Sequence, residues 1–578
     1  MPTMPRVCSL FLFLSFPLTG WSQDPPPQTP VIEGPVDAGA FLAARIAGME
    51  SDFTAATTWF TRALISDPAN TELLEGAILS AIGAGRLDSA LTLATQSPAD
   101  TRSPTAQIVL LADQAKRADF EALLADTRSG RETAALIDQL ATGWAELGAG
   151  RMSEAQDAFD KLSETSGIGV FGIFHKALAL ASVGDFEGAD AIFSGPAGAS
   201  IKSLRRGVIA HAQVLSQLER NPDAIALLDE VFVPGQDAVI SALHARLKAG
   251  EPVPFDVVRN ATDGMAEVFF TLATALNGEA DDTQTLIYAR TAAWLRPDHT
   301  EARLLCAGLL DRLNQPELAT EAYASIAADD PAFVDAERGR AETLSRSGKT
   351  EAAIEVLTTL ARTYPGMIDV QRQLGDLLRR EEKYEAAITA YDAAIALLGP
   401  TPGPRDWSLF YMRGIGHERQ KRWDLANIDF RKALELQPDQ PQVLNYMGYS
   451  MLERNENLDE ALSMIERAVA AEPDSGYILD SLAWGYFQLA RYDDAVVPME
   501  KASLLEPLDP VVTDHLGDVY WAVGRTLEAR FQWRRALSFE PEAKEADRIR
   551  RKLDVGLDVV RAEEGKAPIA AQTAADGI

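Results

Sequence analysis

Residues 510–541 read PVVTDHLGDVYWAVGRTLEARFQWRRALSFEP, and the spacing of a few residues in this stretch recurs along most of the chain. The small residue Gly517 is followed after twelve residues by Ala529, after four more by the large apolar Trp533, and Pro541 closes the stretch. Counterparts of Gly517 stand at Ala273, Ala307, Ala341, Gly375, Gly414, Gly448 and Ala483, in steps of 34 or 35 residues except for one step of 39. The chain is therefore built from a repeated structural unit.

The pattern predicts two helices per unit that cross closely. Gly517 on the first helix and Ala529 on the second leave room for the crossing, and Trp533 fills the space beside them. Pro541 cannot continue a helix, so it ends the unit. Because one helix pair cannot bury its apolar face alone, we expect the units to stack, each held by its neighbours.

A 34-residue period of this kind resembles the tetratricopeptide repeat, a helix–turn–helix unit. The resemblance implies an all-α fold, an α-solenoid whose helix pairs form a right-handed superhelix. We expect middle repeats at 265–398 and C-terminal repeats at 407–541. The Gly- and Pro-rich stretch 399–406 between them is either a longer loop or a hinge. Residues 36–264 keep the pattern only in places and predict irregular helical repeats, and 542–563 predicts a charged capping helix.

The first residues have the features of an export signal. Arg6 precedes a short apolar run from Val7 to Leu18, and Gly20 and Ser22 are small residues at the cleavage positions. This run is shorter than the roughly 20 apolar residues that span a bilayer. We therefore expect a cleaved signal peptide at 1–22, no membrane span, and a location in the periplasm; a retained leader would instead favour a cytosolic co-chaperone.

The composition at both ends of the mature chain predicts segments without helices. Residues 23–35 are rich in Pro and read as an extended linker. Residues 564–578 are mostly small and polar, and they predict a disordered tail.

The charge of the chain argues against partners that carry phosphate groups. Lys and Arg total 54 against 85 Asp and Glu, which gives a net charge of −31. Such a chain repels the phosphates of nucleic acids and of anionic lipids. The sequence therefore predicts protein partners, and it defines no oligomeric state.

No arrangement of residues predicts chemistry. None of the six histidines stands at a metal-ligand spacing, and no phosphate-binding loop or dinucleotide fingerprint is present. We predict no catalytic, cofactor-binding or metal site, with an enzyme site in the weakly patterned 70–250 as the alternative. Cys306 takes a core position of its repeat, which predicts a buried packing residue.

The face of each first helix that is not used for pairing predicts a concave groove. In the last three units, steps of three and four residues place aromatic, acidic and amide side chains on this face. The candidate partner-binding residues are Asn445, Tyr449, Tyr477, Asp480, Trp484, Phe487, Asp514, Asp518 and Trp521. Earlier units carry charged residues there, which are Asp369, Arg372, Asp376 and Arg379, then Asp335, Arg338 and Glu342. Aromatic rings in a groove suit a peptide or a partner helix, and the alternative is that some of them pack against the neighbouring unit.

Residues 440–540 resemble a narrower family. The matching motifs are LNYMGY at 444–449, DEA at 459–461, IERA at 465–468, ILDSLAWGY at 478–486 and DHLGDVYW at 514–521. They resemble the C-terminal half of a bacterial envelope repeat family that includes the lipoprotein partner of a carboxyl-terminal processing protease. The lipidated cysteine of that family has no counterpart here.

This resemblance implies a non-enzymatic scaffold that recruits the protease and its substrates, such as cell-wall hydrolases. The alternative that uses the same groove is a scaffold for envelope polymer export or outer-membrane assembly.

Overall fold

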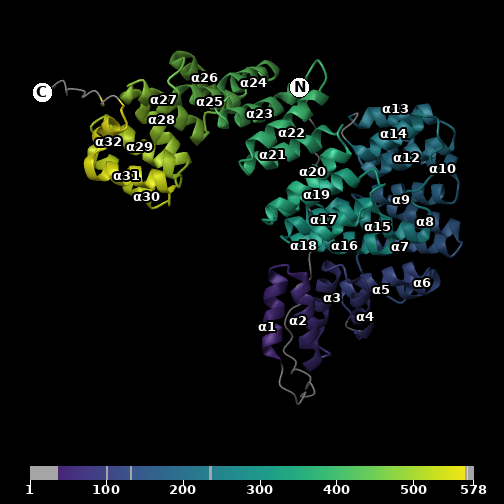
Figure 1. The fold of residues 1–578 in the computed structure, drawn as a ribbon. Coiled ribbons are helices and arrows are strands. Elements are labelled where there is room, and N and C mark those ends of the chain that lie inside the picture. The colour runs from purple at the N-terminus through teal and green to yellow at the C-terminus, as the bar shows by residue number, and fades with distance from the viewer. Residues whose placement is uncertain (1–36, 99–101, 131–132, 234–236, 567–568, 570–578) are drawn as a thin grey trace. The chain divides into compact units, whose positions relative to one another are not determined.

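The computed structural model describes residues 37–98, 102–130, 133–233, 237–566 and 569 (Figure 1). Every regular element in these ranges is a helix, which confirms the predicted all-α solenoid of helix pairs. None of the described helices combines the length and the apolar character that crossing a membrane requires. The predicted signal peptide, the linker and most of the predicted tail lie outside the described residues.

The chain divides into two compact units, Met1–Val356 and Leu357–Ile578, and each is described by itself. The boundary falls inside helix α20 (Thr350–Thr363) and not at the Gly- and Pro-rich stretch 399–406. The end of that stretch forms the short 3-10 helix η1 (Pro404–Asp406). A hinge at 399–406 stays a prediction.

Unit 1 holds the first nineteen helices and the start of the next. They are α1 (Ala38–Met49), α2 (Phe53–Ser66), α3 (Thr71–Gly83), α4 (Leu87–Gln96), α5 (Pro104–Lys116), α6 (Phe120–Arg128), α7 (Ala135–Gly148), α8 (Met152–Ser163), α9 (Gly169–Ser182), α10 (Phe186–Phe193), α11 (Gly198–Ile201), α12 (Arg205–Gln217), α13 (Asn221–Val231), α14 (Ala238–Lys248), α15 (Ala261–Leu276), α16 (Asp282–Leu295), α17 (Thr300–Arg312), α18 (Pro316–Ala324), α19 (Phe333–Arg346) and α20 (Thr350–Thr363).

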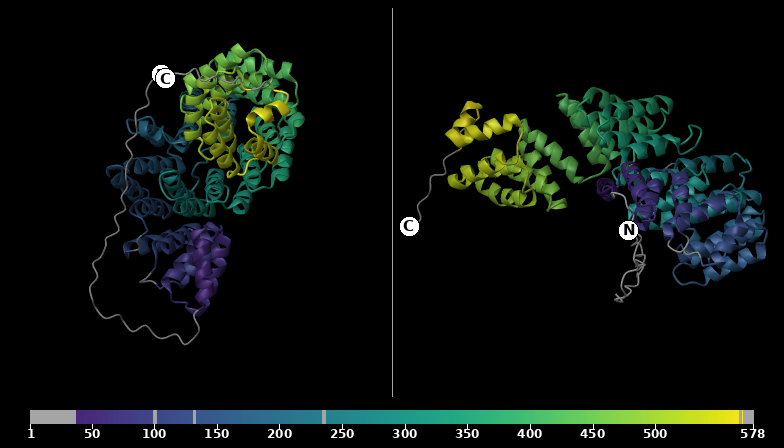
Figure 2. Two further views of the ribbon diagram at one scale, coloured as in Figure 1. Left: turned by 90° about the vertical axis from the view of Figure 1, so that its left-hand side faces the viewer. Right: turned by 90° about the horizontal axis from the view of Figure 1, so that it is seen from below.

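Unit 2 consists of helix pairs that follow one another along the chain, which the two further views also show (Figure 2). Its helices are α21 (Ile368–Arg380), α22 (Tyr384–Leu397), α23 (Trp407–Arg419), α24 (Trp423–Leu436), α25 (Pro441–Glu453), α26 (Leu458–Ala471), α27 (Gly476–Gln488), α28 (Tyr492–Leu505), α29 (Pro510–Ala522), α30 (Thr526–Leu537), α31 (Ala543–Val555) and α32 (Leu557–Glu563).

The predicted crossing of small and large residues is present in the helix pairs. A Cβ atom added to Gly517 of α29 would lie 2.4 Å from the ring of Trp533 on α30. Gly414 stands in the same relation to Phe430, at 2.6 Å. Cys306 is buried, as its place in the repeat predicted. The close crossings therefore depend on the absence of a side chain at the glycines.

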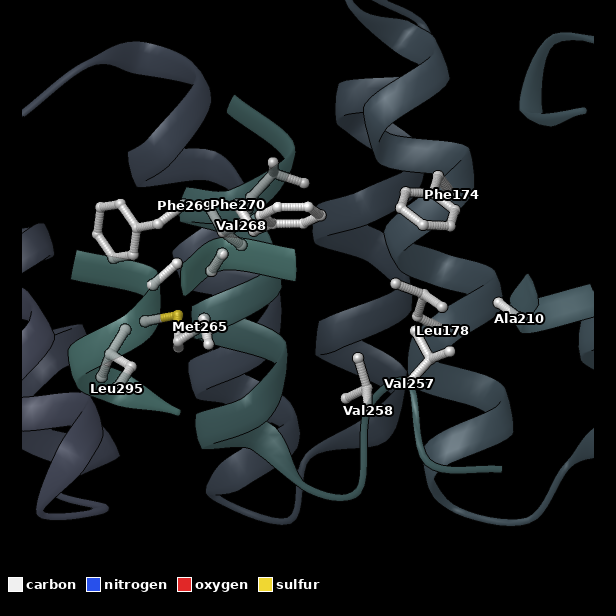
Figure 3. Close-up of a cluster of buried hydrophobic side chains, with 14 of the residues drawn as sticks. Phe174, Leu178, Ala210, Val257, Val258, Met265, Val268, Phe269, Phe270 and Leu295 are labelled. Carbon is white, nitrogen blue, oxygen red and sulfur yellow. The ribbon is translucent and has the colours of Figure 1, made fainter. Parts of the chain in front are cut away.

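Unit 1 adds contacts between helices that are far apart in sequence. Helix α15 packs against α5, α7 and α9, and α16 packs against α3 and α5. In the close-up, Val257 and Val258 lie near Leu178 of α9, and Phe269 and Phe270 lie on the neighbouring helix α15 (Figure 3). We expected contacts between neighbouring units alone, so the return of α15 and α16 onto earlier helices is a feature that the repeat pattern does not contain.

The capping segment forms two helices where one was predicted. Gly556 separates α31 from α32 and has a φ angle of 86°. Glycine adopts this left-handed region without the steric cost that a Cβ atom brings, so the chain bends there and α32 folds back toward α29.

Candidate protein-binding surfaces

The nine candidate groove residues lie on α25, α27 and α29, and they differ in exposure. Tyr477 is exposed, with 56% of its surface accessible. Asn445, Tyr449 and Trp521 are half-buried. The buried ones are Asp480, Trp484, Phe487, Asp514 and Asp518. Most of the face that the spacing predicted as open is therefore closed by contacts within the protein.

Trp484 and Phe487 fill the contact between α27 and α29. Their rings stack with centroids 4.8 Å apart, and the ring of His515 stacks on Trp484 at 3.9 Å. His515 Nδ1 lies 2.9 Å from Asp480 Oδ1. Burial lowers the pKa of His515, but Asp480 and two further acids on α29 raise it more, so the net shift is upward. These side chains join neighbouring repeats, which is the alternative that the sequence left open.

Asp514 and Asp518 are covered by α31. Lys552 Nζ lies 2.5 Å from Asp514 Oδ1 and 2.5 Å from Asp518 Oδ1, and Arg548 Nη1 lies 3.4 Å from Asp518 Oδ2. Burial raises the pKa of Asp518, but Lys552 and Arg548 lower it more, whereas burial keeps the pKa of Asp514 raised. The ion cluster fixes the first capping helix on the last complete repeat.

Helix α32 covers Trp521. The indole Nε1 of Trp521 donates a hydrogen bond to Asp558 Oδ2 at 2.8 Å. The guanidinium of Arg561 lies 5.4 Å from the ring centroid of Phe487. The two capping helices thus occupy the end of the predicted groove.

The repeat spacing could have predicted that the capping helix α31 covers Asp514 and Asp518. Arg548 stands one repeat period after Asp514, and Lys552 stands one repeat period after Asp518. Helix α31 therefore takes the place of the first helix of a further unit, and opposite charges meet across the contact.

One row of this face stays open, at the N-terminal ends of the first helices. Gln442 of α25, Tyr477 of α27 and Val511 of α29 are exposed and occupy equivalent positions of three successive repeats. We call these three residues the open row. Asn445, one turn further along α25, has a buried Oδ1 without a hydrogen-bond partner. The open row combines an aromatic, an aliphatic and an amide group, which suits contact with a protein segment.

The charged residues of the earlier units pair within the protein. Arg372 lies 2.7 Å from Asp369 on α21, and Arg338 lies 3.1 Å from Asp335 on α19. In addition, the hydroxyl of Tyr391 donates to Asp376 at 2.7 Å. These surfaces present charge to solvent and no aromatic anchor.

A second surface, on α12 in unit 1, holds a piece of the chain itself. Residues 251–258 link α14 to α15 in an irregular conformation and cross α12. Gln213 Oε1 accepts from two consecutive backbone N–H groups at 3.0 and 3.3 Å, and Gln217 Nε2 donates to a backbone carbonyl at 2.7 Å. Ser216 Oγ accepts from a third backbone N–H at 3.0 Å. These four bonds are made to the main chain of the segment. Gln213 Nε2 also donates to the side chain of Asp256, at 2.6 Å.

Two arginines make further hydrogen bonds, one to the main chain of this segment and one to helix α15. Arg296 donates to the carbonyls of Asp256 and Val257 at 3.0 and 2.7 Å. Arg206 of α12 makes three hydrogen bonds to Glu267 of α15, at 3.1 to 3.3 Å.

The buried Glu267 stays charged in this setting. Burial raises its pKa, but Arg206 and His299 lower it more, to about 2. The ion pair therefore fixes α15 against α12, and the repeat spacing does not predict a pair 61 residues apart.

No arrangement for metal or thiol chemistry is found in the part of the chain that the structure describes. Among those residues, no three His, Cys, Asp or Glu side chains are grouped so that they could hold a metal ion. Burial raises the pKa of Cys306 to about 11, so its thiol stays protonated at neutral pH.

Known proteins share sequence with parts of this chain. The family described as "Tetratricopeptide repeat" matches residues 372–441. A TPR repeat-containing protein of Pseudomonas aeruginosa is 34% identical over 117 residues, which are 20% of this chain and 19% of that protein. A lipoprotein NlpI homolog of Haemophilus influenzae is 35% identical over 101 residues, which are 17% of this chain and 31% of that protein. The chain thus spans about a fifth to a third of the length of these relatives.

Solved structures of repeat proteins are similar over longer stretches at lower identity. The hetero-tetramer Cut9–Hcn1 of the APC/C aligns with 90% of this chain and 96% of its own, at 14% identity and a TM-score of 0.37.

Proposed function

Because the chain belongs to the tetratricopeptide repeat proteins, we propose that it is a non-enzymatic scaffold of the periplasm that binds protein partners on its concave faces. One partner is a carboxyl-terminal processing protease, and the scaffold recruits substrates to it.

The observation that carries the proposal is the capture of residues 253–257 by α12. Gln213, Gln217 and Ser216 bind the main chain of this segment through four hydrogen bonds of 2.7 to 3.3 Å. Binding through main-chain groups accepts many sequences, which a scaffold for several partners requires. The chain therefore already contains the contacts by which such a face holds a peptide.

The open row is the surface that we assign to the protease. Tyr477 and Val511 expose 56% and 38% of their surfaces on adjacent first helices, within the segment that resembles the protease partner. Exposed aromatic groups of this kind often supply much of the binding energy of an interface. The relative from Haemophilus influenzae is named a lipoprotein, and this name and the features of residues 1–22 support an envelope location.

The test mixes the purified chain, from Gln23 onward, with a purified carboxyl-terminal processing protease. We expect the two proteins to co-elute on size exclusion and the protease to degrade a folded cell-wall hydrolase faster. If neither occurs, the protease assignment is wrong. Cross-linking in envelope extracts that recovers export or outer-membrane assembly proteins in place of the protease would assign the scaffold to those systems.

A further inference from the structure

Helix α30, the second helix of the last pair, carries an exposed apolar face. Leu527 and Phe531 have 84% and 64% of their surfaces accessible. Arg534 is exposed as well, and spacings of four and three residues place the three side chains on one face of the helix. The terminal units of a repeat array normally turn a polar face outward, which keeps the protein soluble. The outer face of α30 therefore differs from that of an ordinary terminal helix.

The residue that corresponds to Leu527 is acidic in the six preceding pairs. These acids are Glu317, Glu351, Glu385, Asp424, Asp459 and Asp493. In two pairs the acid meets the basic residue that precedes the next second helix. Glu317 lies 2.7 Å from Lys349, and the same distance separates Glu385 from Arg422. The position of Leu527 therefore faces the place where a further second helix would begin.

Arg534 faces the same place. The corresponding Arg431 of α24 lies 2.9 Å from Glu460 of α26, which is the next second helix. After α30, helix α31 takes the place of a first helix, and α32 packs on Trp521 of α29 and Phe487 of α27 instead of continuing as a second helix. Within the described residues, the side of α30 that a further second helix would cover is therefore exposed.

The charge of this face is positive, although the chain as a whole is acidic. Helix α30 contains the arginines Arg530, Arg534 and Arg535. Its one acid, Glu528, is paired with Arg525, which precedes the helix. Arg530 and Arg535 donate to backbone carbonyls, which carry no net charge. A carboxylate is therefore the complementary group for this face.

The charges around α30 leave this balance unchanged. Three charged side chains of the neighbouring helix α28 are paired within unit 2, and the pairs are Asp494 with Arg491, Glu500 with Arg525, and Lys501 with Asp474. The acids Glu540 and Glu542 lie beyond the end of α30 at Leu537.

A further exposed apolar residue adjoins the face. Leu508, with 72% of its surface accessible, stands where Asp474 stands in the preceding pair. Asp474 pairs with Lys501 at 2.9 Å. In the last pair the corresponding Arg535 donates to the carbonyl of Pro507, the neighbour of Leu508, at 2.5 Å. An apolar residue thus replaces an acid here as well.

We propose that Leu508, Leu527, Phe531 and Arg534, which we call the α30 face, bind an amphipathic helix of a partner protein. Apolar residues of this helix cover Leu527 and Phe531, and a Glu or Asp pairs with Arg534. The helix lies beside α30 as α26 lies beside α24. A protein helix is favoured over an anionic lipid surface because the net charge of −31 repels lipid phosphates.

The α30 face lies on a second helix and the turn beside it, outside the concave face. The inference therefore goes beyond the protease assignment and adds a different partner. The two assignments can fail separately.

The experiment measures the binding of two fluorescein-labelled peptides to the chain from Gln23 onward by fluorescence anisotropy. Both peptides carry a stripe of Leu at helical spacing, and the flanking positions are Glu in one and Lys in the other. We expect the Glu/Leu peptide to bind more tightly, although the net charge of −31 attracts the Lys/Leu peptide to the chain as a whole. Tighter binding of the Lys/Leu peptide would overturn the proposal.

Phe531→Ser should weaken binding of the Glu/Leu peptide by about tenfold, because it removes the aromatic contact. The matched control is Ile428→Ser. Ile428 takes the corresponding position of α24 and has 63% of its surface accessible, against 64% for Phe531, but α24 is followed by the second helix α26. Equal affinities of the two variants would contradict the assignment of the face.

Arg534→Glu tests the charge of the partner. It should weaken binding of the Glu/Leu peptide by about tenfold, since it places a like charge opposite the carboxylates. The control Arg431→Glu changes the net charge equally at the corresponding position of α24, where Glu460 already provides the carboxylate. If both variants weaken binding equally, the effect belongs to the net charge and the proposal is wrong.

Two further measurements separate the other occupants. Sedimentation with phosphatidylglycerol vesicles, or self-association in light scattering, that Phe531→Ser abolishes would assign the face to lipid or to a second copy and overturn the proposal. Tyr477→Ala should leave the affinity of the Glu/Leu peptide unchanged. If this peptide fails to bind while the protease still binds the wild-type chain, the α30 face is refuted and the protease assignment stands.

Discussion

Lys552 Nζ lies 2.5 Å from Asp518 Oδ1, and neither side chain has any exposed surface. Trp533 Nε1 donates to the same carboxylate oxygen at 2.9 Å, so the last repeat and the capping helix share one buried acceptor. The cap is therefore held by a charge pair inside the protein and not by apolar contact alone.

Lys552→Met should strongly destabilise unit 2. The change keeps the length of the side chain but leaves Asp514 and Asp518 buried with less compensation, which costs about 3–5 kcal/mol of unfolding free energy. Denaturant unfolding followed by tryptophan fluorescence measures it. The control is Lys501→Met, whose exposed pair with Asp474 at 2.9 Å is worth less than about 1 kcal/mol. Equal stability of the two variants would show that the buried cluster is not what fixes the cap.

Gly517→Ala should lower the stability by about 1–3 kcal/mol, because the added Cβ atom would lie 2.4 Å from the ring of Trp533. Gly308 of α17 is the matched control, since no heavy atom beyond its own helix lies within 4 Å of the position of its Cβ atom. Gly308→Ala should stabilise the protein by about 0.5–1 kcal/mol. Thermal melts of both variants measure this, and a normal melt of Gly517→Ala would contradict the crossing geometry.

Gln213→Leu should release the captured segment from α12. Two backbone N–H groups lose their acceptor, and a buried donor without a partner costs about 1–3 kcal/mol. Hydrogen exchange of residues 253–258 should become faster, whereas Gln442→Leu, at an exposed glutamine, should leave it unchanged. Unaltered protection of residues 253–258 in Gln213→Leu would mean that the apolar contacts alone hold the segment.

His175 should make unit 1 less stable in mild acid. It accepts a hydrogen bond from Trp144 Nε1 at 2.9 Å, and burial lowers its pKa from 6.5 to about 4. Between those two values the unfolded chain binds more protons than the folded one, so stability is lost as the pH falls from 6.5 toward 4. His175→Gln should flatten this slope in unfolding measured at several pH values. A slope equal to that of the wild type would assign it to other groups.

The helix pairs follow from the sequence because each depends on residues within one unit. Gly517, Ala529 and Trp533 lie on two adjacent helices, and their spacing alone defines the crossing. The position of Cys306 within its own unit likewise predicted that its side chain is buried. Spacing within a unit is therefore sufficient for the architecture.

The spacing within one unit does not predict which parts of the concave face are exposed and which are covered. Trp484 and Asp518 take groove positions in their own helices, and what covers them is the first helix of the next unit or the cap. The return of α15 onto α7 places Gly264 against the ring of Trp144, a contact that only the folded chain creates. Substitution of Trp484 should consequently change stability before it changes binding.

The affinity of the open-row variant Tyr477→Ala for the purified carboxyl-terminal processing protease decides whether the open row binds this protease. Leu527→Ala is the control, because Leu527 is an exposed apolar residue on the second helix of the last pair, with 84% of its surface accessible. We predict that Tyr477→Ala weakens binding by about 2 kcal/mol with an unchanged melting temperature, and that Leu527→Ala binds as the wild type does. Wild-type affinity of Tyr477→Ala for the protease would contradict the account.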